Sequence, residues 1–315
     1  MGYLLGIDGG GTRTTAWLAD DDLRILARVT GGPSNPIKVG VAAAQHELAQ
    51  VYRGVLREGR IQHRKLDAVC AGLAGADGEP VRGQMLRWIR RYIPARAHLL
   101  TTDAAITLEA ALGGSEGIIV IAGTGSISFA RDEKGEVFRV GGWGSLFDDA
   151  GSGYDIGRKA IAAALRAHDG RGRPTGLLER FCRKLHLRKI TEVVTKDFTT
   201  QDIAALFPLV HQEAIAGDVV ARRLCFEAAE NLAELPITLL KRLGWKRRPV
   251  QVVCSGGIFR SSALIRRAFA RKVHEYGPRT RITLLQREPV EGALLLARQL
   301  ACSESTRPTR PGGEA

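Results

Sequence analysis

The feature that most constrains this chain is an arrangement of elements that the sequence contains twice. Residues 4–18 combine an apolar run that ends in Asp8, three glycines and a stretch rich in β-branched residues. Residues 117–131 repeat this pattern around Gly123-Thr124-Gly125-Ser126. β-Branched and aromatic residues favour strands, and glycine lets a backbone turn tightly and approach an anion closely. We therefore predict two hairpins, each made of a strand, a glycine turn and a second strand.

The stretch after the first glycines separates this pattern from two common nucleotide motifs. In dinucleotide-binding and Walker loops, a helix begins directly after the glycines. Here residues 12–18 have the composition of a strand, and the Gly-Lys-Ser/Thr of a Walker loop is absent from the sequence. A hairpin with backbone N–H groups at its tip and Asp8 at its root suits nucleotide phosphates and their metal. An ordinary tight turn is the alternative, and the second hairpin favours the phosphate site.

Apolar periodicity beyond the hairpins predicts the same order of elements in both halves of the chain. In the N-terminal half, we expect strands and helices at residues 24–29, 41–56, 67–73, 81–92, 97–101 and 104–112. In the C-terminal half, we expect elements at 136–140, 156–243 with breaks at 170–174 and 207–208, 249–254, 261–274, 281–285 and 290–300. Two copies of a βββαβαβα unit indicate a duplicated α/β fold.

This order predicts two domains, at residues 1–112 and 113–302, with a helical insert at about 156–243. The final helix, at about 290–302, is a candidate to pack back on the first domain. We expect residues 303–315, which are polar and contain proline and glycine, to be disordered. If the domains face each other, both hairpins line one interdomain cleft and grip a nucleotide from two sides.

Composition limits the classes of protein to which the chain can belong. Apolar residues make up 44% and charged residues 25%, as in soluble globular proteins. We expect no transmembrane helix and no membrane partner, because no run of about 18 apolar residues occurs. We also expect no signal peptide and a cytoplasmic location, because the N-terminal residues read directly as a strand. The five scattered cysteines form no CxxC pair, which speaks against a structural zinc or iron–sulfur site.

The net charge of +13 raises the question of a nucleic-acid partner. The arginines are dispersed along the predicted helices, no nucleic-acid motif occurs, and aromatic residues make up only 6% of the chain. We therefore expect no nucleic-acid partner and interpret the charge as a basic surface that helps to attract anionic nucleotides.

Several short motifs, in order along residues 3–302, carry a resemblance to a known family. The motifs are Gly6–Thr12, Ser34-Asn35, Thr101–Ala105, Ile121–Ser126, Gly141–Gly144, Asp149 with Gly151–Tyr154, and Ser255–Gly257. Together they resemble the sugar kinase/actin/Hsp70 ATPase superfamily, and within it the BadF/BadG/BcrA/BcrD-type ATPases and their N-acetylglucosamine kinase branch. The resemblance implies two actin-like (ribonuclease H-like) domains and binding of ATP, Mg²⁺ and an amino sugar, and we expect a homodimer.

The resemblance also implies roles for individual residues. The first phosphate loop corresponds to Gly10, Gly11 and Thr12, with Asp8 near Mg²⁺, either in direct contact or through a water molecule. The second phosphate loop corresponds to Gly123, Thr124 and Gly125, and the adenosine-contacting turn to Gly256 and Gly257. The positions that hold the sugar match Asn35, Asp103, Ser126, Gly142, Trp143 and Asp149.

Asp103 is our candidate for the catalytic base. A carboxylate within reach of the sugar 6-hydroxyl can orient that group and accept its proton. The position of Asp103, between a strand and a helix, suits a helix N-cap equally well, and the Thr-Thr-Asp-Ala-Ala match favours the base. Without the resemblance, Asn35 reads as a turn residue, Trp143 equally as part of the core and Asp149 as a solvated loop charge.

Two departures from the family pattern bear on the substrate. Ala150 stands where amino-sugar kinases commonly have glutamate, and Asp155 replaces a frequent tryptophan. We therefore place N-acetylglucosamine first and keep glucosamine, N-acetylmuramic acid and plain hexoses as alternatives.

An alternative of another class is an ATPase that activates 2-hydroxyacyl-CoA dehydratases, although the scattered cysteines do not match the iron–sulfur site of such proteins. We discount a transcriptional regulator, because only residues 1–3 precede the first hairpin.

Overall fold

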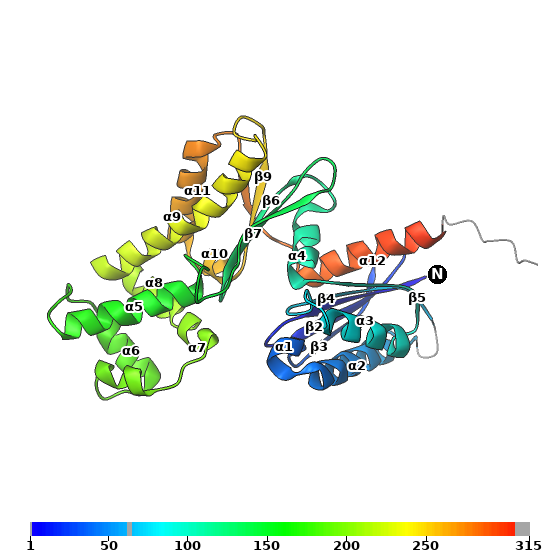
Figure 1. The fold of residues 1–315 in the computed structure, drawn as a ribbon, viewed down its shortest axis with the longest axis horizontal. Helices are drawn as coiled ribbons and strands as arrows, with labels where there is room; N and C mark the ends of the chain where they lie inside the picture. Colours follow the sequence, from blue (N-terminus) through cyan, green and yellow to red (C-terminus); the bar gives the residue numbers. More distant parts are fainter. Residues whose placement is uncertain (1, 62–64, 306–315) are drawn as a thin grey trace, which may run out of the picture. The chain divides into compact units, whose positions relative to one another are not determined.

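The computed structural model describes residues 2–61 and 65–305 as two compact units (Figure 1). Unit 1 is the described part of Met1–Gly114 and Gln286–Ala315, and unit 2 is Ser115–Leu285. The first crossing between units thus follows Gly114, two residues beyond the predicted boundary. The chain returns to unit 1 at Gln286, so the last helix belongs there and not to the second domain.

The five strands of unit 1 form one mixed sheet in the order β3-β2-β1-β4-β5. Their bounds are β1 (Tyr3–Gly9), β2 (Thr14–Asp20), β3 (Ile25–Gly31), β4 (Leu66–Leu73) and β5 (Ala95–Thr101). The first three strands pair antiparallel, and β4 and β5 follow parallel to β1. Asp8 pairs with Gly72, and Gly72 pairs with Thr101. The carboxyl ends of three parallel strands therefore meet at one edge, which places Asp8 near the residues after Thr101.

Helices cover both faces of this sheet. They are α1 (Pro36–Val39), α2 (Val41–Glu58), α3 (Val81–Tyr92), α4 (Asp103–Leu112) and α12 (Pro289–Ser305). One core joins the sheet to α2 and α3, and a second joins it to α4 and α12. The glycine at Gly292 lets α12 approach α4 closely, because a Cβ there would collide with the carbonyl oxygen of Ile106.

The predicted disordered tail begins too early. Helix α12 continues through Ser305, so the prediction is wrong for residues 303–305. No proline or glycine interrupts the sequence before Pro308, so the helix continues beyond the predicted end. Residues 306–315 of the predicted tail lie outside the described residues.

Unit 2 repeats the sheet of unit 1 in the order β10-β9-β6-β7-β8. Its strands are β6 (Gly117–Ala122), β7 (Ser126–Arg131), β8 (Val137–Gly141), β9 (Gln251–Ser255) and β10 (Arg281–Leu284). Three antiparallel strands are again followed by two parallel ones. The repeated strand order confirms the predicted duplication of an α/β unit.

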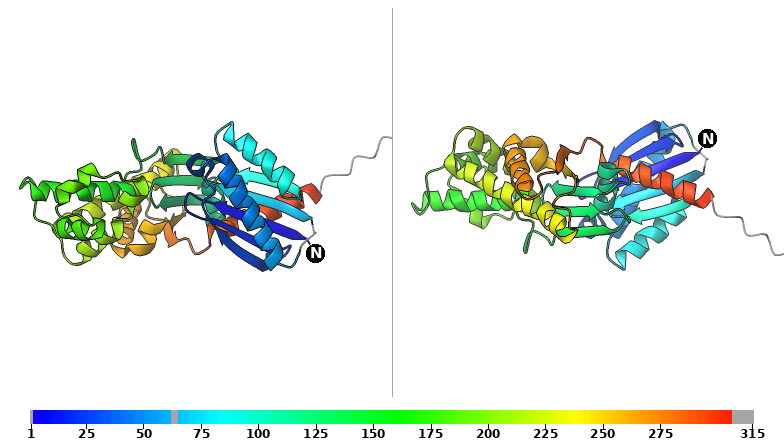
Figure 2. Two further views of the ribbon diagram at one scale, coloured as in Figure 1. Left: turned by 90° about the horizontal axis from the view of Figure 1, so that it is seen from below. Right: turned by 90° about the horizontal axis from the view of Figure 1, so that it is seen from above.

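Between β8 and β9, the helical insert gathers in a cluster with α9 leading back to the sheet (Figures 1 and 2). Its elements are α5 (Gly153–His168), α6 (Leu177–Leu185), the 3₁₀ helix η1 (Ile190–Thr195), α7 (Thr200–Ala204), α8 (Phe207–Ile215) and α9 (Val219–Arg242). The short α10 (Gly257–Ser261) and α11 (Ala263–Tyr276) follow β9, and α11 packs against α9. The predicted break at Phe207-Pro208 is instead the start of α8, because proline fits the first turn of a helix.

In the described part of the chain, no single helix is long and apolar enough to cross a membrane. Thr200–Ile215 and Val219–Arg242 pass that test only as a pair, with a bend of 118° between them. Apolar residues of both segments form the core of unit 2, among them Phe207, Val210, Leu232 and Leu239.

Candidate functional site

The tip of the first hairpin is held by backbone hydrogen bonds. The Gly10 N–H donates to the carbonyl of Arg13 at 2.9 Å. The Gly10 carbonyl in turn accepts the N–H groups of Ser34 (3.1 Å) and Asn35 (3.2 Å). Within residues 2–61 and 65–305, the N–H groups of Gly11 and Thr12 have no partner. Unpaired N–H groups at a turn form an anion-binding concavity, so the tip can receive phosphate oxygens.

Lys38 lies against the same tip, and sequence reasoning missed it. A Cβ added at Gly11 would lie 2.9 Å from Lys38 Nζ, so the ammonium group is next to the unpaired N–H groups. The side chain is exposed, and it forms no ion pair among the described residues. The sequence carried no signal for this placement, because residues 31–36 read only as a loop and α1 is a single helical turn.

Asn35 is the N-cap of α1. Its Oδ1 accepts the N–H groups of Ile37 (3.0 Å) and Lys38 (3.2 Å). The side-chain oxygen is therefore committed to the helix, as the turn interpretation of this residue suggests. The Nδ2 group has no partner in the described part of the chain, so Asn35 keeps a donor, but not an acceptor, for a sugar hydroxyl.

In unit 1, Asp8 is close enough to Asp103 for the charge of one carboxylate to affect the pKa of the other. Burial, the charge of Asp103 and that of Glu288 raise the pKa of Asp8 to about 6, against a smaller opposing effect of Arg13. Burial also raises the pKa of Asp103, although the N–H of Ala104, which donates to Oδ1 at 2.9 Å, acts in the opposite direction. A raised pKa is the property that a carboxylate needs to accept a proton near neutral pH.

The N-cap role, the alternative to the catalytic base at Asp103, belongs to its neighbour. Thr102 caps α4, with its Oγ1 accepting the Ala105 N–H at 3.1 Å, and Asp103 is the first helical residue. The carboxylate of Asp103 is therefore not needed to start the helix.

Among the described residues, no group of three or more His, Cys, Asp or Glu side chains is arranged to hold a metal ion. Asp8, whose carboxylate has no hydrogen-bond partner there, suits Mg²⁺, which binds one or two carboxylates together with substrate phosphates.

The second hairpin is anchored by the turn that leads into α5. The carbonyl of Gly123 accepts the Gly153 N–H at 2.8 Å, and that of Thr124 accepts the Tyr154 N–H at 3.2 Å. Ser126 belongs to β7, and its Oγ donates to the carbonyl of Ala150 at 3.0 Å. The N–H groups of Thr124 and Gly125 have no partner in the described chain, as at the tip of the first hairpin.

Asp149 is part of this anchor. The side chain is buried, at 7% exposure, and Oδ1 accepts the Ser126 N–H at 3.3 Å. A Cβ at Gly125 would lie 2.7 Å from Asp149 Oδ2, so a larger residue there would push the carboxylate out of its position. Burial raises the pKa of Asp149. The interpretation of Asp149 as a solvated loop charge is therefore wrong, and its carboxylate is held against the hairpin.

Asp155, the residue that departs from the family pattern, fixes the same turn. It is 7% exposed, and Oδ2 accepts the Gly151 N–H at 3.0 Å and the ammonium of Lys159 at 2.8 Å. Lys159 also donates to Glu227 Oε1 in α9 at 2.7 Å. Asp155 thus acts as a structural carboxylate behind the hairpin.

Trp143 and Gly142 follow β8 in the same unit. Trp143 is 68% exposed, so it is not part of the core. The Arg139 guanidinium covers one face of the ring, 4.3 Å from the centroid, and donates to the carbonyl of Gly142. Trp143, Gly141 and Asp148 help to line a pocket of about 430 Å³. The free face of the indole can pack on the apolar side of a sugar.

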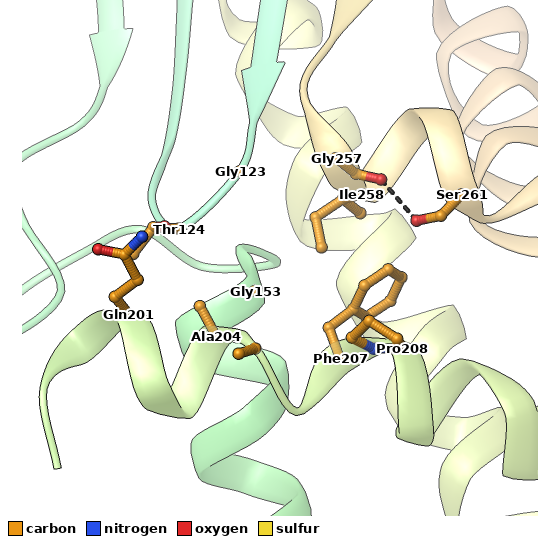
Figure 3. A pocket seen from close by; sticks show the side chains of 11 residues that line it. Gly123, Thr124, Gly153, Gln201, Ala204, Phe207, Pro208, Gly257, Ile258 and Ser261 are labelled. Carbon is orange, nitrogen blue, oxygen red and sulfur yellow. Dashed lines mark hydrogen bonds between the residues drawn. The ribbon is translucent and has the colours of Figure 1, made fainter. Parts of the chain in front are cut away.

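A pocket of about 370 Å³ adjoins the second hairpin (Figure 3). Gly123 and Thr124 of the hairpin, Gly153 of α5, and Gly257, Ile258 and Ser261 of α10 line it on one side. The insert closes the other side with Gln201, Ala204, Ala205, Phe207 and Pro208. This pocket has the apolar walls and few polar groups that a nucleotide base requires.

Gly256 and Gly257 shape one wall of this pocket in different ways. Gly256, with a φ of +100°, makes the turn after β9, and any Cβ there would collide with the carbonyl of Ala122. Gly257 starts α10 and lines the pocket itself. Sequence reasoning missed the insert residues, because the distant position of Phe207-Pro208 along the chain gives no sign that it faces the hairpin.

The predicted site residues thus fall into two groups. Unit 1 holds Asp8, Gly10, Gly11, Thr12, Asn35 and Asp103, and unit 2 holds Gly123, Thr124, Gly125, Ser126, Gly142, Trp143, Asp149, Gly256 and Gly257. Each unit by itself presents a glycine hairpin with unpaired N–H groups and acidic side chains close to it.

Comparisons with known proteins identify a family and several relatives of this chain. The model of the BadF/BadG/BcrA/BcrD ATPase family matches residues 5–297. The N-acetylmuramic acid/N-acetylglucosamine kinase of Clostridium acetobutylicum is 32% identical over 306 residues, which are 95% of this chain and 99% of that protein. The N-acetyl-D-glucosamine kinase of Dictyostelium discoideum is 30% identical over 308 residues, 93% and 97% of the two chains. A solved candidate N-acetylglucosamine kinase of Chromobacterium violaceum has a TM-score of 0.78 and 27% identity, covering 94% of this chain and 99% of that one.

The substitution Ala205→Trp tests the pocket beside the second hairpin. Ala205 is exposed and lines the pocket, so an indole there is expected to fill the space and weaken ADP binding at least about tenfold without unfolding the protein. Calorimetric titration measures the affinity. Ala216→Trp, exposed just beyond α8 and outside the pocket, serves as the control. Unchanged ADP affinity in the first variant would show that the base binds elsewhere.

The substitution Asp8→Asn tests the raised pKa. The pKa of Asp8 is 3.8 in the unfolded chain and about 6 in the folded protein, so folding is penalised while the carboxylate is ionised. The penalty is complete above pH 6, shrinks as the pH falls through 6, and is gone below 3.8. We therefore expect the variant, without nucleotide or metal, to be more stable than the wild type in urea near pH 8. The greater stability of Asp8→Asn relative to the wild type should be largely lost near pH 4. An equal advantage at both values, or the same change in the exposed control Asp22→Asn, contradicts the assignment.

Proposed function

Because the chain belongs to the BadF/BadG/BcrA/BcrD ATPase family, we propose that it transfers the γ-phosphate of ATP to the 6-hydroxyl of an amino sugar, with N-acetylglucosamine as the first candidate. The observation that carries this proposal is the pair of glycine hairpins, each with unpaired N–H groups, one of them beside a base-sized pocket. Phosphoryl transfer depends mainly on positioning and charge stabilisation, which backbone N–H groups and cations supply.

On the nucleotide side, the proposal assigns the base to the pocket between α7–α8 and α10. The phosphates then extend along the second hairpin toward Thr124 and Gly125. Gly11 and Thr12 of the first hairpin donate to the terminal phosphate, and Lys38 adds a positive charge there. Mg²⁺, held beside Asp8, supplies charge neutralisation to the phosphates when it is bound.

On the sugar side, Asp103 accepts the proton of the attacking hydroxyl. Asn35 Nδ2 donates to a sugar hydroxyl, since its oxygen caps α1. Trp143 packs on the apolar face of the ring, and the turn that contains Asp149, with Gly142 and Ser126, completes the sugar contacts. We propose that the two units close around ATP and sugar, because exclusion of water keeps the phosphoryl group from hydrolysis. A cytoplasmic homodimer remains our prediction for the working enzyme.

The buried cysteines speak against the dehydratase activator of the same family. Its iron–sulfur cluster needs thiolates that a partner subunit can share. Cys70, Cys225 and Cys254 are buried in the cores of the units. Burial raises the pKa of Cys225 to about 11 and that of Cys254 to about 12, so both stay protonated. The positions of these cysteines therefore fit a sugar kinase better than a dehydratase activator.

A sugar panel tests the proposed function directly. Release of ADP is measured with N-acetylglucosamine, glucosamine, N-acetylmuramic acid and glucose, and NMR locates the phosphate on the product. We expect the highest kcat/KM with N-acetylglucosamine and the phosphate on the 6-oxygen. ADP release that no sugar stimulates would overturn the kinase. Turnover of glucose equal to that of the amino sugars would instead restrict the proposal to a hexose kinase.

Asp103→Ala tests the proposed base. The variant is expected to lose at least about 100-fold in kcat, because general base catalysis contributes that much, while ADP binds with unchanged affinity. Asp22→Ala, an exposed aspartate of the same unit, is the matched control. Turnover near that of the wild type would remove Asp103 as the base.

A further inference from the structure

A further pocket of unit 2 lies at the far end of α5 and has no part in the proposed reaction. Its volume is about 440 Å³, and its lining includes four arginines, Arg166, Arg171, Arg173 and Arg223, together with Val219 and Val220. This volume is within the range of about 300–1,000 Å³ that small-molecule sites occupy. Gly153, at the start of α5, lines the pocket beside the hairpin, and Arg166 follows 13 residues later. At about 1.5 Å per residue, roughly 20 Å of helix separates the two pockets.

Most of the positive charge in this pocket is uncompensated. Arg171 pairs with Asp169, Nε to Oδ2 at 3.0 Å. Among the described residues, Arg166, Arg173 and Arg223 form no ion pair, and Arg166 only donates to the carbonyl of Arg171 at 3.5 Å. Four guanidinium groups thus line a shared space, and one of them is paired with a carboxylate. Guanidinium groups bind phosphate through two parallel hydrogen bonds, so such a cluster selects phosphate-bearing ligands.

The start of α9 adds backbone donors to the same pocket. The helix begins at Val219 and runs for 24 residues, so its positive end lies at the pocket. Asp218 caps Ala221, Oδ1 to N at 2.8 Å, while its Oδ2 accepts Thr175 Oγ1 and the Gly176 N–H, both at 2.8 Å. The carboxylate of Asp218 is therefore engaged outside the pocket. The N–H groups of Val219 and Val220 have no partner in the described chain.

We propose that this pocket binds the phosphate group of a small phosphorylated metabolite, at a site separate from the kinase centre. The arginines and the first turn of α9 hold the phosphate. Val219, which is 59% exposed, offers an apolar wall to the carbon skeleton of a phosphate monoester. A phosphate monoester and free inorganic phosphate share the recognised group, and a pocket of about 440 Å³ suits either better than a nucleic acid, which needs an extended basic surface.

Calorimetry on the full chain tests this site with two probes, glucose 6-phosphate and inorganic phosphate. Excess ADP and N-acetylglucosamine are present so that the kinase centre is filled. The double variant Arg173→Gln/Arg223→Gln removes two cations that form no ion pair, so its fold is expected to be intact. Arg57→Gln/Arg90→Gln, two exposed arginines of unit 1, removes the same charge elsewhere.

We expect saturable binding of at least one probe, weakened at least about tenfold in the first double variant and unchanged in the second. Tighter binding of glucose 6-phosphate assigns the site to a monoester, and equal binding assigns it to the free anion. No saturable binding to the wild type, an equal loss in both double variants, or binding of an oligonucleotide but of neither probe overturns the proposal. These outcomes are independent of sugar-dependent ADP release, so the site and the kinase can fail separately.

Discussion

Close packing against glycine sets the geometry of the second hairpin, and the candidate site of unit 2 depends on it. Asp149 can bind the Ser126 N–H because Gly125 carries no side chain where Oδ2 lies. Gly256 likewise lets the end of β9 touch the carbonyl of Ala122 at the end of β6. These approaches leave the N–H groups of Thr124 and Gly125 at the tip without partners among the described residues. An anion is the partner that such groups bind most favourably.

A second layer of interactions holds this geometry from behind. Asp155 binds the Gly151 N–H and Lys159, and Lys159 reaches Glu227 in α9. Asp155 is the buried member of this series, so removing its partner Lys159 would leave a buried carboxylate without its cation, which is costly. Through these contacts the helical insert fixes the turn beside the second hairpin as well as lining the pocket next to it.

Much of this could be predicted from the sequence because the signals are local. Alternating β-branched residues around glycines define both hairpins, and the family motifs identify Asp8, Asp103 and Gly123–Gly125. Residues that meet only in the folded chain could not be predicted. Lys38 lies against Gly11 because α1 turns the chain back, and Phe207 reaches the hairpin across the insert. Asp155 and Lys159 have the i, i+4 spacing of a helical ion pair, which can be seen in the sequence. Glu227, the second partner of Lys159, lies 68 residues further along the chain, which the sequence does not indicate.

The site of unit 1 combines opposite charges at short range. Asp8, Asp103 and Glu288 lie at the carboxyl edge of the sheet, while Lys38 and Arg13 lie at the hairpin tip. Burial of the Asp8 and Asp103 carboxylates is unfavourable for the empty protein, and cationic ligands relieve it. Negative charge thus gathers at the edge of this sheet within a chain of net charge +13.

The return of α12 to unit 1 has a consequence for how the protein is made. Leu4, Cys70 and Ile106 share a core with Val290, Leu294 and Ala297, so this core lacks one wall until the last helix has been synthesised. Unit 2, which ends at Leu285, leaves the ribosome complete before that helix does. The N-terminal unit, although translated first, is therefore the last to mature, and a ribosome that stops early releases a chain with an open apolar face that chaperones would have to cover.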